Sequence, residues 1–173
     1  HAEALFLRGL AHFDLVRTYA KQYTVDKTAL GVPYVTVTHS KRKPARNTVD
    51  TVYTNIIADL TTAEKLIADN YTREGVTSTT SVTSKLAIQA LLSRVYLYMG
   101  EWQKSADYAT TVIKSGKFSI WKAEEYADAF KADAQTGGEV IFDVYGLKAN
   151  SYDGYWDAIT WLTNPDGYSD CAT

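Results

Sequence analysis

Residues 86–113 read LAIQALLSRVYLYMGEWQKSADYATTVI and predict two helices joined at Gly100. The helix before the glycine, 84–99, is apolar on most sides, which is typical of a helix buried between neighbours. A serine or threonine near 81–84 is expected to cap its start. The second helix should run over 101–115, with these residues turned inward: Trp102, Ala106, Ala109, Val112 and Ile113. The pair indicates a scaffold, so function is expected in what the scaffold carries.

Two longer helical patterns precede this pair. Residues 3–20 carry an apolar face at helical spacing, made of Phe6, Leu7, Leu10, Ala11, Phe13 and Val16. Gly9 costs about 1 kcal/mol relative to alanine, and close approach of a neighbouring helix is the expected compensation. Residues 48–68, capped by Thr48, carry a second stripe, made of Val49, Val52, Tyr53, Ile56, Ile57, Leu60, Ala63 and Ile67. The same periodicity turns Asp59 toward water.

The rest of the chain is less regular. Residues 22–47 connect the two long helices, and Pro33 argues against a central strand there because proline removes a backbone donor. Residues 122–132 predict a short helix. Residues 139–145 alternate in a way that predicts a strand, and 146–173 read as loop.

Composition excludes several classes of protein. The chain has 173 residues and a net charge of −2, and its only basic run is 41–43, whereas nucleic-acid binders show a larger basic footprint. No apolar run is long enough to span a bilayer. Cys171 is the single cysteine, so neither an internal disulfide nor a CxxC metal site is possible. The sequence therefore predicts no nucleic-acid partner.

Catalytic and metal motifs are also missing from the sequence. There is no HExxH, GxSxG, phosphate-binding loop or GxGxxG pattern, and the three histidines lack ligand spacing. Glu139 and Asp143 would share one face of the predicted strand, but they are not expected to act as a glycosidase pair. Residues 164–170 are interpreted as a turn and not as a Ca²⁺ loop. We expect no catalytic residue, no metal and no cofactor.

The spacing of Leu92, Tyr96, Gly100 and Trp102 matches the middle of a tetratricopeptide (TPR) unit. In such a unit the aromatic residue after the turn packs beneath the first helix, and small residues let the second helix lie close. The helices over 3–20 and 48–68 would form a second, more degenerate pair. The chain therefore predicts TPR-like helical hairpins.

Several separated segments together resemble the SusD/RagB family of nutrient-binding outer-membrane lipoproteins of Bacteroidota. In chain order they are AEALFLRGL (2–10), FDLVR (13–17), GVP (31–33), the helix that opens with VD at 49–50, ALLSRVYLYMGEW (90–102) and EVIF (139–142). Family members are several times longer, so the chain is expected to be an interior piece. The lipid-bearing cysteine of the family is missing, and Cys171 does not replace it.

The resemblance implies a mainly α, SusD-like fold of TPR-like helical hairpins in an α-α superhelix, with a small α+β or loop extension. Residues 1–116 would form the scaffold, and 117–173 would begin a variable, partly β, ligand-binding subdomain. The implied protein is a surface-exposed lipoprotein of the outer membrane that binds an oligosaccharide, or sometimes a peptide, without cutting it. It would deliver this ligand to a SusC-like TonB-dependent transporter, and a lipid anchor outside this chain would be its only membrane contact.

Aromatic residues concentrate from residue 118 onward, where eleven of them lie, including three of the four tryptophans. Sugar rings stack their C–H faces on aromatic planes, and loops on a rigid scaffold are where binding residues concentrate. The predicted ligand-binding residues are Tyr145, Asn150, Tyr152, Asp153, Tyr155, Trp156 and Trp161. The alternative is that these rings pack a core, which is the interpretation favoured for Phe118, Phe130 and Phe142.

A second function remains open at this point. The chain could belong to a TPR adaptor that binds a protein or peptide partner in its helical groove. A lipid-bearing cysteine at the start of the complete protein would favour nutrient capture, and a cytosolic start would favour the adaptor.

Overall fold

The computed structural model describes residues 1–37, 43–76, 79–131 and 138–144. In these ranges the chain forms six α-helices and no strand. The helices are α1 (Ala2–Tyr19), α2 (Tyr23–Asp26), α3 (Val49–Leu66), α4 (Lys85–Met99), α5 (Trp102–Lys114) and α6 (Ala123–Lys131), with a 3-10 turn over Thr79–Ser81. None of the helices in these ranges has the length and apolar character needed to cross a bilayer.

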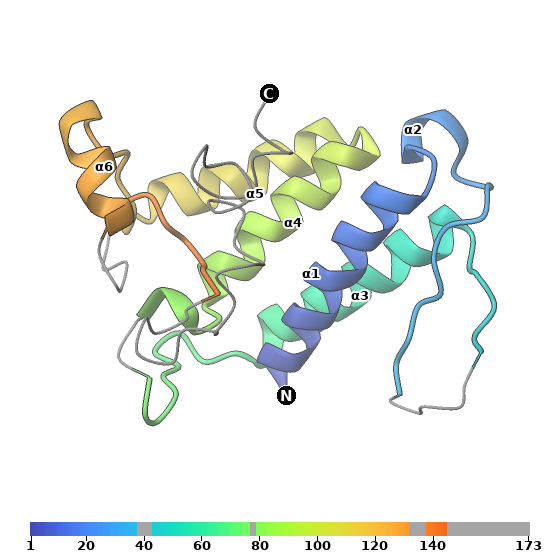
Figure 1. Cartoon of the computed structure of the whole chain (residues 1–173), viewed down its shortest axis with the longest axis horizontal. Helices are drawn as coiled ribbons and strands as arrows, with labels where there is room; N and C mark the ends of the chain where they lie inside the picture. The colour runs from blue at the N-terminus through green and yellow to red at the C-terminus, as the bar shows by residue number, and fades with distance from the viewer. Residues whose placement is uncertain (38–42, 77–78, 132–137, 145–173) are drawn as a thin grey trace, which may run out of the picture.

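The four long helices form two stacked pairs. Helix α1 packs against α3, α4 packs against α5, and α3 also contacts α4. Figure 1 shows the pairs side by side, with the connection between α1 and α3 on one side of the molecule and α6 on the other. This arrangement confirms the predicted mainly α fold of TPR-like hairpins.

Local signals in the sequence set where these helices begin and end. The Thr48 hydroxyl accepts the Thr51 N–H at 3.2 Å, and the Ser84 hydroxyl accepts the Ala87 N–H at 3.1 Å. Both predicted N-caps are therefore confirmed, and each satisfies a donor that the first turn leaves without a helical partner. Gly100 ends α4 with φ +78°, a left-handed conformation that residues with a Cβ atom rarely adopt.

The close approach predicted at Gly9 is confirmed. A Cβ atom at this position would lie 3.0 Å from Cδ2 and 3.1 Å from Cγ of Leu60 on α3. Leu60 is fully buried, as are its core neighbours Phe13, Ile56, Ile88 and Leu92. The glycine therefore lets α1 and α3 approach until their side chains interlock, and this packing offsets its poor helix propensity.

Two predicted helix faces are partly wrong. On α1, Leu7 is 43% exposed and Ala11 is exposed, whereas His12 is buried. On α5, Trp102 is 65% and Ile113 is 76% exposed, and the buried residues are Ser105 and Val112. Helix α5 meets α4 through small residues, since the Ser93 hydroxyl donates to the Ser105 carbonyl at 2.8 Å. Tyr108 of α5 also stacks on Tyr96 of α4, with ring centroids 5.8 Å apart, whereas Trp102 and Ile113 lie on the outer face.

The strand predicted over 139–145 is also wrong for its described part, 139–144, which has no strand geometry. The Asp143 N–H donates to the Thr80 carbonyl at 3.0 Å, but a single bond of this kind makes no ladder. Ile141 and Phe142, consecutive residues that would point to opposite faces of a strand, both pack against the helical core. Contact with the helices decides their conformation, and the alternating pattern does not.

Candidate ligand-binding site

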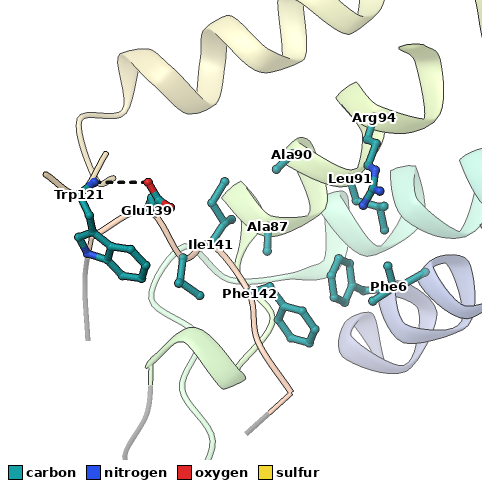
Figure 2. Close-up of a pocket in the computed structure, with 11 residues that line it drawn as sticks. Phe6, Ala87, Ala90, Leu91, Arg94, Trp121, Glu139, Ile141 and Phe142 are labelled. Atoms are coloured by element: carbon teal, nitrogen blue, oxygen red, sulfur yellow. Dashed lines mark hydrogen bonds between the residues drawn. The ribbon is translucent and has the colours of Figure 1, made fainter. Parts of the chain in front are cut away.

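A groove of about 450 Å³ lies between α1 and α4, the first helices of the two pairs. Figure 2 shows the residues that line it, which come from α1, α4, the segment after α5 and the segment 138–144. We call this the α1–α4 groove. Its lining residues are Phe6, Leu10, Ala87, Ala90, Leu91, Arg94, Trp121, Glu139, Val140, Ile141 and Phe142.

The floor of the groove is apolar because α4 turns alanine and leucine side chains toward it and α1 adds a phenyl ring and a leucine. Ala87 and Leu91 of α4 are buried, one turn apart, and Phe6 of α1 is buried beside them. The Phe142 ring meets the Phe6 ring edge to face, with centroids 5.0 Å apart and planes at 78°. The chain therefore covers part of its own helical groove with the segment 138–144.

Trp121 forms one wall, and two backbone contacts hold it there. The backbone N–H of Trp121 donates to Oε2 of Glu139 at 3.3 Å, shown as the dashed line in Figure 2. The Ser119 N–H donates to the Gly138 carbonyl at 3.1 Å. Tyr126 of α6 meets the Trp121 indole edge to face, with centroids 6.2 Å apart. The segments 119–121 and 138–139 are thereby tied together at the mouth of the groove.

Gly138 is what makes room for the indole. Its φ is +72°, and a Cβ atom there would overlap Nε1, Cε2 and Cδ1 of Trp121. The ring therefore lies directly against the glycine backbone. Glycine at 138 is needed for two separate reasons, the left-handed conformation and the space for the ring.

Gly138→Ala is expected to destabilise the protein more than Gly75→Ala does. Gly75 has nearly the same φ, +77°, but a Cβ there would meet nothing within 4 Å. Both variants bear the cost of left-handed alanine, so their difference isolates displacement of the indole, about 1–3 kcal/mol. Urea unfolding of both variants measures it. Equal losses would show that Trp121 is not seated against Gly138.

Charged groups stand at the rim of this apolar floor. Figure 2 shows Glu139 beside Trp121 at one end of the drawn residues and Arg94 of α4 at the other. Arg94 is exposed, and Glu139 is half-buried with one carboxylate oxygen on the Trp121 N–H. An aromatic plane, a carboxylate acceptor and a guanidinium donor around an aliphatic floor suit binding of an amphipathic ligand. In the described part of the chain, no group of three or more His, Cys, Asp or Glu residues could hold a metal.

The binding residues predicted from the sequence lie elsewhere. Tyr145, Asn150, Tyr152, Asp153, Tyr155, Trp156 and Trp161 are all outside the described residues, so their role stays a prediction. The Phe130 side chain is outside them too. The packing role predicted for Phe142 is confirmed. Sequence reasoning counted Trp121 in the aromatic cluster but missed its place in the groove, because most residues that line the groove with it are distant in the sequence.

Comparisons with known proteins agree with this architecture. A SusD-like family model, described as "Starch-binding associating with outer membrane", matches residues 1–97. A putative sugar-binding protein from Bacteroides vulgatus superposes with a TM-score of 0.80 at 35% identity, over 97% of this chain and 37% of that one. A SusD superfamily protein from Bacteroides thetaiotaomicron gives a TM-score of 0.72 at 36% identity, over 86% of this chain and 31% of that one.

A curated relative, SusD-like protein P2 of Formosa agariphila, is 27% identical over 161 residues, which are 89% of this chain and 28% of the relative. The chain thus spans less than a third of that protein's length. The helical pairs and the groove between them define a TPR-like helical scaffold. The family model matches more than half of the chain, so the chain belongs to the SusD-like family.

Proposed function

We propose that the protein binds an oligosaccharide at the cell surface without cleaving it, and delivers it to a SusC-like TonB-dependent transporter. In this proposal it is a surface-exposed lipoprotein whose anchor lies outside residues 1–173. The helical pairs are the rigid platform, and the aromatic and polar residues 145–161 supply ligand contacts. Membership of a starch-binding, outer-membrane-associated family is the observation that carries the proposal.

The contents of the α1–α4 groove favour this function over that of a TPR adaptor. An adaptor needs its helical groove open for a partner peptide, a mode of recognition in which the groove receives apolar anchors. Here Phe142 packs edge to face on Phe6, and Ile141 lies against the same helical core. The chain's own segment therefore takes the place of part of such a peptide.

Calorimetry of the full-length protein against a panel of oligosaccharides and peptides tests the proposal. We expect binding to at least one glycan, weakened by Trp156→Ala with the melting temperature nearly unchanged. Trp102→Ala is the matched control, because this tryptophan lies on the outer face of α5. Tight peptide binding with no glycan binding would contradict the carbohydrate proposal. A large melting shift in Trp156→Ala would assign that residue to a core.

A further inference from the structure

We propose that the α1–α4 groove is itself a sugar subsite, in which one pyranose ring stacks on Trp121 and a hydroxyl of that ring bonds to Glu139. This inference rests on the proposed function and assigns it a second set of residues, separate from 145–161. Figure 2 shows Trp121 and Glu139 next to each other at one end of the aliphatic floor. The groove, at about 450 Å³, lies within the range of about 300–1,000 Å³ that is usual for small-ligand sites.

The Trp121 indole is positioned in advance as a stacking plane. Its backbone is tied to Glu139, its ring lies against Gly138, and Tyr126 meets its ring plane edge to face at 76°. Contacts on the backbone, the ring and its neighbour leave the indole little rotational freedom to lose on binding. Prior ordering of this kind lowers the entropic cost of capturing a ring.

The polar groups of the groove suit hydroxyls better than an apolar ligand. The carboxylate of Glu139 accepts one N–H from Trp121, and a carboxylate has about four acceptor sites. Arg94, which is exposed on α4 at the far end of the floor, offers donors to a further sugar unit of a longer glycan. Between them the floor of Ala87, Ala90 and Leu91 is aliphatic. A pyranose has both kinds of surface, an apolar C–H face and an edge of hydroxyls, whereas a purely apolar ligand would make no use of the remaining acceptor sites of Glu139.

The test uses the full-length protein and a glycan that the wild type binds in calorimetry. Trp121→Ala should weaken binding roughly tenfold or more, as loss of an aromatic stacking plane does for other ring ligands. Glu139→Gln keeps an acceptor for the Trp121 N–H but removes the charge, and should weaken binding roughly threefold to tenfold. Trp102→Ala should leave the affinity unchanged.

A second measurement keeps the test sharp if Trp121→Ala folds poorly. The indole N–H resonance of Trp121, identified by its loss in Trp121→Phe, should shift when the glycan is titrated into the wild type. An affinity of Glu139→Gln within twofold of wild type, with an unmoved indole resonance, would overturn the subsite and leave the proposed function standing. Failure of the wild type to bind any glycan would overturn both.

Discussion

Asp59→Ala is expected to lower the free energy of unfolding by about 3 kcal/mol, because it leaves a partly buried guanidinium without its counter-ion. Breaking a buried ion pair costs about 3–5 kcal/mol. The lower end applies here, since the Arg8 side chain keeps 29% of its exposure and water can partly replace the carboxylate. Urea unfolding of wild type and variant measures the loss.

The geometry around Asp59 explains why the effect should be large. Arg8 of α1 donates from Nε to Oδ2 at 2.5 Å and from a terminal nitrogen to Oδ1 at 2.6 Å, a bidentate pair. Tyr34, in the connection between α1 and α3, donates its hydroxyl to Oδ2 at 2.5 Å. Burial and this hydrogen bond to Asp59 raise the pKa of Tyr34, and the hydrogen bond to Asp59 raises the pKa of Arg8. One carboxylate thus joins α1, α3 and the connection between them.

Asp69→Ala is the matched control. Asp69 also pairs with a cation, Lys85, at 2.8 Å, but its side chain is 83% exposed. An exposed pair of this kind contributes at most about 1 kcal/mol. The double variant Arg8→Met with Asp59→Leu should recover most of the loss, because an apolar pair can replace a buried ionic one. Similar losses in Asp59→Ala and Asp69→Ala would contradict the structural role assigned to Asp59.

Asp59 also marks the limit of what helical periodicity could predict. The pattern placed Asp59 off the apolar stripe and facing water, yet it is buried. Its partner Arg8 lies 51 residues earlier, and no spacing rule connects the two. The caps at Thr48 and Ser84 and the stop at Gly100 were predictable because each depends on a few adjacent residues. Helix α5 was placed correctly but its outward-facing side chains were not, because which side of a helix is covered depends on its neighbours.

The candidate site was likewise predictable from the sequence only in part. Aromatic enrichment predicted a sugar-binding region after residue 118, and Trp121 belongs to that region. The α1–α4 groove arises from contacts between α1, α4 and 138–144, which local pattern does not encode. Gly138 carried a signal that could have been used, because a glycine before a β-prone stretch often marks close approach of another group. The residues 145–161 remain predictions of composition alone.

Phe13→Ala should cost about 3–5 kcal/mol, the usual range for deleting a fully buried phenyl ring. Phe13 has no exposed surface. Its ring meets Tyr53 of α3 edge to face at 6.0 Å and Tyr98 of α4 edge to face at 5.4 Å between centroids. The Arg17 guanidinium lies 4.8 Å from the ring centroid. A single side chain on α1 thus contacts its own partner helix and the neighbouring pair.

This bridging position makes the expected loss testable in a second way. Leu15→Ala on the same helix is the control, since Leu15 is 43% exposed and should lose much less. A double-mutant cycle between Phe13→Leu and Tyr98→Leu should give a coupling of about 0.5–1.5 kcal/mol, typical of an edge-to-face pair. Zero coupling would mean that the two helical pairs are held together without this contact. Because α1 and α4 also form the floor of the groove, the proposed subsite predicts that Phe13→Ala weakens glycan binding as well.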